Sequence, residues 1–416
     1  YPTDVMETGY DILFFWVARM VMAAALFTND IPFHTIYLHG LVRDGSGRKM
    51  SKTTGNVTDP IDVIQEFGAD ALRFTLLTSG SPGADLNLAL DRVESNRNFS
   101  NKLWNIARFV IRSFDRAKKE DRPADLSASL GTADRWILTR LGETINTVDR
   151  LMDSYQFGEA GRQIYDFMWN DFADWYVEVA KIQLSAGGAN AWTTLHVLGT
   201  VLDHTLRLLH PYIPFVSEET WQQLRAAAME SGLGIGSQET WPEALIIADW
   251  PRPTLSDPTA SADFELMRDL IRRIRNARAE QGVEPSRFIP AVVTAGDKQA
   301  LLESQRPILT ALARLDDDAL VIAAGATPPA QALTLALGPV TCYLPLVGMI
   351  DPAAERIRLE KEDAEFAKQI DRLSTLLNSP FAQKAPAAVV GKEREKLTAL
   401  ETGQREIRER LRSLDA

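Results

Sequence analysis

Residues 31–60 read IPFHTIYLHGLVRDGSGRKMSKTTGNVTDP, and the organisation of the whole chain can be worked out from this stretch. Its first part, IPFHTIYLHGLV, is rich in apolar and β-branched residues, which predicts a buried strand. The residues DGSG, 44–47, predict a turn, and two lysines three positions apart, Lys49 and Lys52, come directly after it. We therefore expect a strand that leads into a loop with two positive charges.

The segments on either side of this stretch predict an α/β arrangement. Residues 9–27 are apolar almost all round, which predicts a buried helix. A buried helix followed by an apolar strand is typical of a sheet with parallel strands. On the other side, residues 62–75 predict a helix, and Asp59 and Pro60 suit its first turn.

A long helical region follows, from about residue 91 to residue 224. Apolar residues recur there at spacings of three and four. We expect the second helix of this region to begin near Thr132 and the fourth helix to end before Pro211. This pattern predicts an antiparallel helix bundle. The aromatic run WNDFADWY, 169–176, is expected to lie in its core.

The last third predicts two smaller structures. A segment rich in Gly, Pro and Ser precedes an amphipathic helix at 263–281, and short β-like runs follow it, which together predict a small α+β unit. Heptad spacing of apolar residues at 359–377 and 390–414, with the helix-breaking segment NSPFAQKAP between them, predicts an antiparallel coiled-coil hairpin.

Composition limits the possible classes of protein. With 416 residues and 45% hydrophobic residues, the chain can bury several cores, and the single cysteine, Cys342, excludes an internal disulfide and a cysteine zinc knuckle. We expect a reducing cytoplasm. The absence of 18 consecutive apolar residues predicts no membrane span. A start without methionine or a signal-peptide pattern suggests a piece of a longer protein.

The net charge of −11 argues against nucleic-acid binding, but the charge is unevenly distributed. Between residues 97 and 122, three acidic residues oppose eight basic ones, which are Arg97, Lys102, Arg108, Arg112, Arg116, Lys118, Lys119 and Arg122. This basic stripe fits an RNA-binding face and fits a solvated helix face equally well.

The lysine loop suits chemistry at a triphosphate. Lys49 and Lys52 can place two positive charges over the phosphates, where they would stabilise the charge that develops on a departing pyrophosphate. Met50 is expected to anchor the loop through apolar contacts, and the hydroxyls of Ser51 and Thr53 to close it with hydrogen bonds. A lone pair of lysines means little, whereas the string RKMSKTxGNxxDP after an apolar strand is highly specific.

This string resembles the KMSKS signature of class I aminoacyl-tRNA synthetases, with Thr53 in the fifth position. Further stretches, spread over the whole chain, resemble valyl-tRNA synthetases in particular. They are YPTDVMETGYDILFFWVARM, PFHTIYLHGLVRD, FGADALRF, NRNFSNKLWNIARF, WNDFADWY, HPYIPFVSEETW and KAPAAVVGKEREKL.

The resemblance implies roles for residues of the loop and of the first helix. Lys49, Ser51 and Lys52 are implied as catalytic. Binding of ATP is implied for His39, Gly40, Met50, Lys52 and Thr53. The valine pocket is implied to include Asp11, Ile12 and Trp16; without the resemblance Trp16 would be taken for a core residue. Ile12 and Trp16 are four apart, which would put both on one face of a helix.

For RNA, the resemblance implies anticodon reading by Lys102, Arg108 and Phe109, which we expect to share one groove. An aromatic ring beside a guanidinium suits unstacked bases, although Phe109 could instead be buried in the bundle core. Asp91 stands where a related enzyme uses arginine, so a contact to RNA there is in doubt. In the hairpin, Lys392, Arg394 and Lys396 are candidate phosphate contacts, or are simply solvated.

The resemblance also divides the chain into five parts. Residues 1–58 are expected to form the second half of a Rossmann-type catalytic domain with the lysine loop, 59–96 a connector to the tRNA stem, 97–255 an antiparallel anticodon-binding helix bundle, 256–345 a small α+β unit, and 346–416 a coiled-coil tRNA-binding arm.

The implied activity is ATP-dependent ligation of L-valine to valine tRNA, by an enzyme that acts as a monomer in the cytoplasm. Magnesium would accompany ATP, and no metal site or bound prosthetic group is expected. The sequence has no HxGH tetrapeptide and no editing domain, so we expect the chain alone to be inactive. A stand-alone tRNA-binding protein derived from a synthetase is the alternative, which the retained Lys49, Lys52, Ile12 and Trp16 disfavour.

Overall fold

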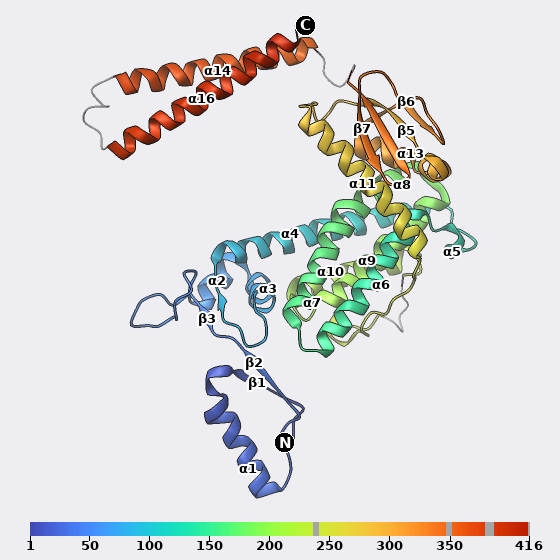
Figure 1. Ribbon diagram of the computed structural model, residues 1–416. Helices are drawn as coiled ribbons and strands as arrows, with labels where there is room; N and C mark the ends of the chain where they lie inside the picture. The colour runs from blue at the N-terminus through green and yellow to red at the C-terminus, as the bar shows by residue number, and fades with distance from the viewer. Residues whose placement is uncertain (236–240, 347–351, 379–386, 415–416) are drawn as a thin grey trace. The chain divides into compact units, whose positions relative to one another are not determined.

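The computed structural model is mostly helical (Figure 1). It describes four stretches of the chain, which are residues 1–235, 241–346, 352–378 and 387–414. The chain forms two compact units, Tyr1–Leu266 and Met267–Ala416. The first contains the N-terminal strands and the helix bundle, and the second contains a small sheet and a helical hairpin.

The first unit opens with a strand–helix–strand segment. Strands β1 (Val5–Gly9) and β2 (Thr35–His39) are parallel and in register, with Gly9 opposite His39. The parallel arrangement predicted from the sequence is confirmed. Three helical pieces connect the two strands: a 3-10 turn at Tyr10–Ile12, a π-helical segment at Leu13–Val17 and helix α1 at Ala18–Thr28.

The prediction that this connecting helix is buried is wrong. Phe14 is 81% exposed, Trp16 57% and Phe27 80%, while Val17 and Ala24 are buried. Parallel strands and their crossover helices are normally covered on both faces, but the described chain offers the helix only two strands to pack on. By length and composition Tyr10–Thr28 could even cross a membrane, with a mean hydropathy of 1.7. The segment does not contain 18 consecutive apolar residues, because Asp11 and Arg19 interrupt it.

A short connector follows the strands. Strand β3 (Val42–Arg43) pairs in parallel with β4 (Leu86–Asn87), and helices α2 (Pro60–Phe67) and α3 (Ala69–Ser79) lie between them in the sequence. The side chain of Asp59 accepts a hydrogen bond from the Ile61 amide and caps α2, as expected. The single helix predicted for residues 62–75 is divided, because Gly68 has a φ of +91°.

The helix bundle confirms the sequence pattern. Its order is α4 (Leu90–Ser113), α5 (Leu126–Ser129), α6 (Thr132–Asp153), α7 (Phe157–Asp166), a π-helical segment (Phe167–Tyr176), α8 (Val177–Ala186), α9 (Gly188–Leu209) and α10 (Pro214–Ser231). Of the aromatic run 169–176, Phe172, Trp175 and Tyr176 are buried, as predicted, whereas Trp169 is only half-buried. Helix α4 is continuous across residues 96 and 97, so the connector and the bundle share a helix.

Two close contacts fasten the connector to the bundle. The carboxylate of Asp70, in the first turn of α3, accepts hydrogen bonds from the amides of Phe215 and Val216 at the start of α10, at 3.3 and 2.7 Å. Helix α7 approaches the end of α3 so closely that a Cβ on Gly158 would lie 2.5 Å from the carbonyl oxygen of Gly80. The elements that follow the lysine loop are thereby attached directly to the bundle.

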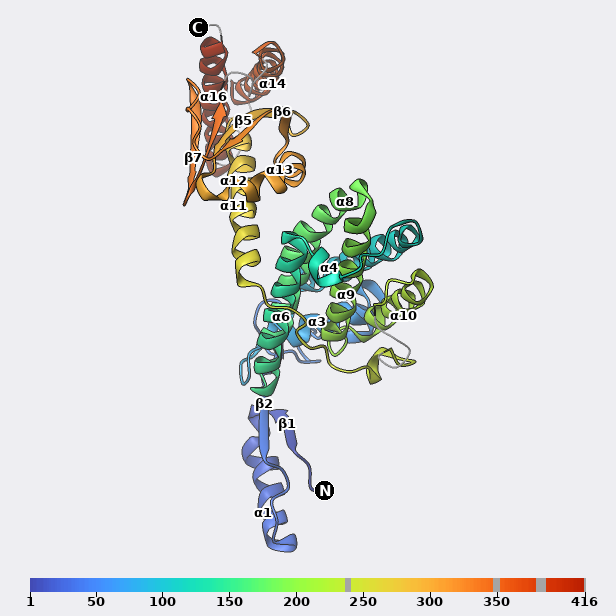
Figure 2. The same ribbon diagram turned by 90° about the vertical axis from the view of Figure 1, so that its right-hand side faces the viewer.

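The second unit contains a four-stranded mixed sheet in the order β6-β5-β8-β7. The strands are β5 (Ile289–Thr294), β6 (Leu315–Ala323), β7 (Ala332–Leu337) and β8 (Val340–Pro345), and helix α11 (Pro258–Glu280) precedes them. Helices α12 (Gln299–Ser304) and α13 (Arg306–Ala313) pack beside β6 (Figure 2). This confirms the small α+β unit. Burial raises the pKa of the Cys342 thiol on β8 to about 12.

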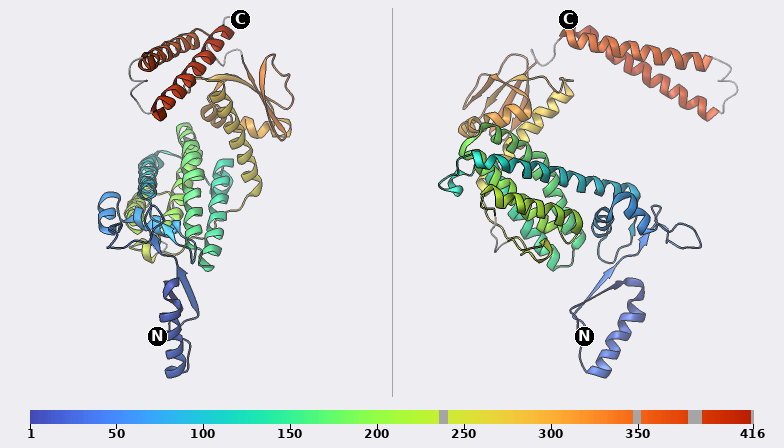
Figure 3. Two further views of the ribbon diagram at one scale, coloured as in Figure 1. Left: turned by 60° about the vertical axis from the view of Figure 1, so that its left-hand side comes forward. Right: turned by 180° about the vertical axis from the view of Figure 1, so that it is seen from behind.

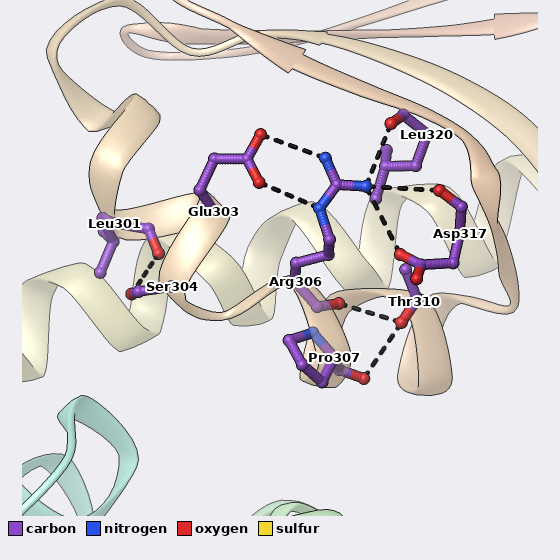
Figure 4. Close-up of polar contacts among 8 residues, drawn as sticks. All are labelled: Leu301, Glu303, Ser304, Arg306, Pro307, Thr310, Asp317 and Leu320. Atoms are coloured by element: carbon purple, nitrogen blue, oxygen red, sulfur yellow. Dashed lines mark hydrogen bonds and ion pairs between the residues drawn. The ribbon is translucent and has the colours of Figure 1, made fainter.

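Arg306 connects the helices of this unit to its sheet (Figure 4). Its guanidinium donates two hydrogen bonds to the carboxylate of Glu303, at 2.9 and 3.1 Å. It also donates to the carbonyl oxygen of Leu320 at 3.1 Å and to Asp317 at 3.4 Å. A planar guanidinium can satisfy this many acceptors at once, and the start of α13 is therefore fixed to β6.

The chain ends in two long helices that lie side by side, α14 (Pro352–Asn378) and α16 (Ala387–Leu414) (Figure 3). Arg408 pairs with Asp363 at 2.9 Å, and the Phe366 ring packs against Gly403, so the helices run in opposite directions. The predicted heptad positions Leu359 and Ile407 are buried. Most of the predicted helix break, residues 379–386, lies outside the described residues.

Candidate functional site

The lysine loop is organised around the carboxylate of Asp44. This carboxylate accepts hydrogen bonds from the Asn56 side chain at 2.9 Å, from the amides of Arg48 and Ser46 at 2.8 and 3.0 Å, and from the Arg48 guanidinium at 3.0 Å. These donors, the Asn56 amide first, lower the pKa of Asp44 to about 2. Asp44 therefore fixes both the turn that opens the loop and the residue that closes it.

Asn56 completes the closure from the other side. Its amide group also donates to the Lys49 carbonyl at 3.1 Å, and its oxygen accepts from the Ser51 amide at 3.0 Å and the Thr54 hydroxyl at 2.8 Å. An asparagine suits this position because it donates and accepts at the same time. Neither Asp44 nor Asn56 was predicted to have this role, although Asn56 belongs to the RKMSKTxGNxxDP string.

The shorter side chains of the loop behave as predicted. The hydroxyls of Ser51 and Thr53 lie 2.6 Å apart, and the Thr53 amide donates to Ser51 Oγ at 3.2 Å. Met50 packs against the buried cluster that includes Val63, Leu72 and Val93, which anchors the loop. Met50 and Ser51 thus shape the loop from inside, while Thr53 is exposed on its surface.

The ammonium groups of the two lysines are unpaired in the described part of the chain. Both Lys49 and Lys52 are exposed, and no hydrogen bond or ion pair involves either ammonium group within the described part of the chain. Their backbones are held, since the Lys49 carbonyl accepts from Asn56 and the Lys52 carbonyl from the Gly55 amide at 3.4 Å. A positioned backbone with free charged ends is the arrangement needed to stabilise negative charge on a polyphosphate.

His39 and Gly40 lie where the parallel strands end, which is where α/β folds bind ligands. The His39 ring is 3.5 Å from the Glu7 carboxylate, and its Nδ1 is 2.9 Å from the Gly40 carbonyl oxygen. A Cβ on Gly40 would lie 1.7 Å from the carbonyl oxygen of Ala84, so only glycine fits there. A cavity of about 480 Å³ is lined by both residues and also by Tyr155 and Phe157.

Asp85 was not predicted, and it connects the two halves of the candidate site. Its carboxylate accepts hydrogen bonds from the Leu41 amide at 2.8 Å, the Arg43 guanidinium at 2.5 Å and the Tyr10 hydroxyl at 3.4 Å. The Leu41 amide, followed by Arg43, lowers the pKa of this carboxyl. Strand β3, which leads into the lysine loop, is thereby fastened to the segment that begins at Tyr10.

The candidate valine-pocket residues lie on this segment, but the predicted helical face is not present. Ile12 ends a 3-10 turn and Trp16 lies in the π-helical segment, so their four-residue spacing is not that of an α-helix. Both are exposed, Ile12 to 38% and Trp16 to 57%. Asp11 lies close to Gly9, where an added Cβ would be 2.8 Å from the Asp11 carboxylate and 3.5 Å from the His39 ring.

The three candidate anticodon residues lie on two different flanks of α4, which corrects the prediction of one shared groove. Lys102 bonds to Asp174 at 2.5 Å and lies 3.7 Å from the centre of the Trp169 ring. Lys181 covers the half-buried Phe109 ring on the same flank, at 5.7 Å. With 3.6 residues per turn, Arg108 is rotated by roughly 100° from Phe109, and it lines a cavity against α10 instead.

Of the remaining candidates, Asp91 and Lys396 have local partners. Asp91 lies in the first turn of α4, and its carboxylate accepts a hydrogen bond from the Arg92 amide at 2.8 Å. The positive end of the helix dipole stabilises a carboxylate at this position. In the hairpin, Lys392, Arg394 and Lys396 are exposed, and Lys396 pairs with Glu393 at 2.7 Å. Among the described residues, no group of three or more His, Cys, Asp or Glu could hold a metal ion.

Three family models match the chain. Residues 1–89 match "tRNA synthetases class I (I, L, M and V)", residues 134–293 match "Anticodon-binding domain of tRNA ligase", and residues 351–415 match "Valyl tRNA synthetase tRNA binding arm". The lysine loop and the Tyr10–Thr28 helix fall inside the first match. Helix α4, with Lys102, Arg108 and Phe109, falls between the first and the second.

Curated relatives extend the similarity to the whole chain. This chain is 42% identical to a valine–tRNA ligase of Bacillus cereus over an alignment of 419 residues. The alignment covers 100% of this chain and 46% of that protein. It is also 43% identical over 402 residues to the valine–tRNA ligase of Geobacillus kaustophilus, an alignment that covers 95% of this chain and 44% of that protein. The chain thus spans about half the length of these relatives. A structure of Mycobacterium tuberculosis methionyl-tRNA synthetase with methionyl-adenylate is 23% identical over 62% of this chain and 50% of that chain, with a TM-score of 0.45.

The chain contains, in order, a lysine loop within a class I synthetase match, a helix bundle that lies largely within an anticodon-binding match, and a helical hairpin within a match specific to valyl enzymes. Both of these relatives are named valine–tRNA ligase. The chain therefore belongs to the valyl-tRNA synthetase family, as a part of the synthetase that contains its anticodon-binding and tRNA-binding domains.

Proposed function

We propose that this chain takes part in the ATP-dependent ligation of L-valine to valine tRNA. The observation that carries the proposal is the lysine loop, in which Asp44 and Asn56 hold the backbone while the ammonium groups of Lys49 and Lys52 stay unengaged by the described residues. A loop that only connected two elements would not need two unpaired cations on a fixed frame.

In this proposal the loop acts during formation of valyl-adenylate. A carboxylate oxygen of valine attacks the α-phosphorus of ATP, and the bond from that phosphorus to the pyrophosphate oxygen breaks. Negative charge grows on the departing pyrophosphate, and Lys52, assisted by Lys49, stabilises it more strongly in the transition state than in the ground state. His39 and Gly40 border the adenosine side of the site. Magnesium enters with ATP as part of the substrate, and no bound prosthetic group takes part.

The exposed face of the Tyr10–Thr28 helix is proposed to be covered by the rest of a Rossmann-type catalytic domain. Its apolar side chains, such as Phe14 and Phe27, suit a protein interior, and the segment falls within the class I synthetase match. Covering this face would enclose Ile12 and Trp16 in a small apolar slot for valine, with Asp11 beside it. We propose that the chain alone does not activate valine, because the described residues leave this pocket open on one side.

The bundle and the hairpin are proposed to bind valine tRNA. The Phe109 flank of α4 would take an anticodon base, and the α14–α16 hairpin, as an antiparallel coiled-coil arm, would contact the tRNA through Lys392, Arg394 and Lys396. We further propose a monomer in the cytoplasm. The five-part division at residues 58, 96, 255 and 345 belongs to the same proposal.

A stand-alone tRNA-binding protein is the second candidate, because the bundle has a complete buried core of its own, including Trp136, Phe172 and Trp221. Two measurements on the chain address both functions. Filter binding should show preference for valine tRNA over the same tRNA with a changed anticodon, and valine-dependent ATP–pyrophosphate exchange should be absent. Equal binding of both tRNAs would contradict the RNA role, and clear exchange would contradict the open pocket.

A further inference from the structure

Between α4 and α10 lies a cavity of about 310 Å³, on the flank of α4 opposite to the side of Lys102 and Phe109. We refer to it as the α4–α10 pocket. From α4 it is lined by Trp104, which is 41% exposed, by Arg108 and Arg112, and by the apolar residues Ala107 and Ile111. From α10 it is lined by Glu219, Thr220 and Gln223.

The hydroxyl of Thr220 is the most informative feature of this pocket. Thr220 is 1% exposed, and its Oγ1 has no hydrogen-bond partner among the residues that the structure describes. Other buried threonines in helices of this chain donate to the carbonyl four residues earlier, as Thr75 and Thr205 do at 2.7 Å. A buried polar atom without a partner destabilises a fold, so a ligand in the cavity that reached this hydroxyl would gain affinity by bonding to it.

The other walls define the chemistry of that ligand. An exposed indole offers a flat surface for stacking. The Gln223 amide can donate and accept, and it already donates to the Glu219 carboxylate at 3.2 Å. That carboxylate keeps phosphate away from the α10 side, whereas Arg108 and Arg112 can attract phosphate at the rim. Arg108 donates to Asn105 at 3.1 Å and still has unused donors. A planar heterocycle with polar edges, joined to an anionic backbone, satisfies all of these groups.

We propose that the α4–α10 pocket binds one unstacked base of the RNA, separately from the base taken by the Phe109 flank. The inference rests on the proposed tRNA binding and deepens it. Single-stranded loops can splay their bases outward, so one loop can present bases to both flanks of a helix about 10–12 Å across. Trp104 stacks on the base, Thr220 and Gln223 bond to its edge, and Arg108 and Arg112 contact the adjoining phosphates.

The experiment uses the whole chain and a fluorescein-labelled anticodon stem–loop hairpin of valine tRNA, with fluorescence anisotropy as the readout. A set of hairpins, each lacking the base at one loop position, is compared with the intact hairpin. One of these abasic hairpins should bind about 5- to 150-fold more weakly. Trp104→Ala should weaken the intact hairpin by a similar factor and leave the affinity of that abasic hairpin unchanged. Trp104→Phe should keep most of the affinity.

A second variant separates binding from folding. Thr220→Val removes only the hydroxyl, so it should raise the melting temperature while lowering affinity for the intact hairpin about 2- to 12-fold. The matched control Thr205→Val removes a hydroxyl that is already bonded, so it should lower the melting temperature and leave hairpin affinity unchanged.

The possible failures are distinguishable. If the unaltered chain does not bind the hairpin, the proposed tRNA binding fails and this pocket assignment fails with it. If the hairpin binds but Trp104→Ala and Thr220→Val leave its affinity unchanged, only the pocket assignment is overturned. Titration with free ribonucleoside monophosphates gives a third arm: binding that depends on Trp104, without any effect in the abasic series, would assign the pocket to free nucleotides and overturn its assignment to RNA.

Discussion

The Tyr10–Thr28 helix and helix α9 are both strongly apolar, yet their environments are opposite. Along α9, Leu195 and Leu198 are fully buried and Trp192 is 4% exposed, whereas Phe14 is 81% exposed and Trp16 57%. Helix α9 packs extensively against α6, α8 and α10, whereas among the described residues α1 packs extensively only against the π-helical segment that precedes it. Hydrophobicity therefore shows that a helix needs partners, and the rest of the chain determines whether it has them. The core of the bundle is closed among the described residues, and the segment proposed for the valine pocket is open.

The largest difference is expected between two variants, one that removes a buried indole from the bundle and one that removes an exposed indole from the N-terminal helix. Trp136 is fully buried, stacks on Phe264 at 4.2 Å and donates to Glu265 at 2.9 Å, so Trp136→Ala should destabilise the bundle by about 3–5 kcal/mol. Trp16→Ala in the same chain should change stability by no more than about 0.5 kcal/mol. Urea unfolding of both variants tests this, and similar losses would show that the N-terminal helix is already packed.

The next effect concerns catalysis, in a protein that joins the preceding half of the Geobacillus kaustophilus relative to this chain. Lys52→Ala should slow adenylate formation about 100- to 1000-fold, with little change in valine affinity, because the lost charge acts on the transition state. Lys361→Ala, an exposed lysine of α14, is the control. An unchanged single-turnover rate for Lys52→Ala would remove that residue from the catalytic set.

A smaller effect is expected on the Phe109 flank of the complete bundle. Phe109→Ala should weaken binding of valine tRNA by about 1–3 kcal/mol and narrow its advantage over a tRNA with a changed anticodon. Because Phe109 is half-buried under Lys181, a melting curve of the same variant has to accompany the binding data. A lower melting temperature with an unchanged preference would identify Phe109 as a structural residue.

The smallest effect belongs to Asp44, and it depends on pH. Its folded pKa of about 2 lies below the ordinary 3.8, so its contribution to stability is fully present above about pH 4 and is lost as the pH falls towards 2. Asp44→Asn should therefore lower the unfolding midpoint at pH 7 and make little difference near pH 2. If the unfolding midpoints of the Asp44→Asn variant and the unaltered chain differ by the same amount at pH 7 and near pH 2, Asp44 does not act through its charge.

Periodicity predicted the elements well where a helix or strand packs against its neighbours in the sequence. The bundle helices, the four strands of the small sheet and the end helices all lie close to their predicted positions, because their apolar spacing reflects contacts that exist in the chain. The break at Gly68 was missed, since a glycine with positive φ does not alter the apolar pattern on either side of it.

The site was predictable in its charged residues and much less so in its frame. Lys49 and Lys52 follow from the string, but the hydrogen bonds of Asp44, Asn56 and Asp85 join residues up to 75 positions apart, and no local pattern reports them. The rotation of roughly 100° between Arg108 and Phe109 follows from helix geometry, but the sequence does not show which neighbouring helix packs on each flank of α4. That choice is made by tertiary contacts, and so is the open α4–α10 pocket.

Valine-dependent ATP–pyrophosphate exchange by the joined protein tests most directly whether this chain provides the second half of a catalytic domain. Each half alone should give only background exchange, and the joined protein should show exchange that requires valine and is lost with Lys52→Ala. A joined protein that binds valine tRNA as the chain does, yet gives no exchange with valine, would contradict the proposal that the lysine loop and the Tyr10–Thr28 helix belong to a valine-activating site.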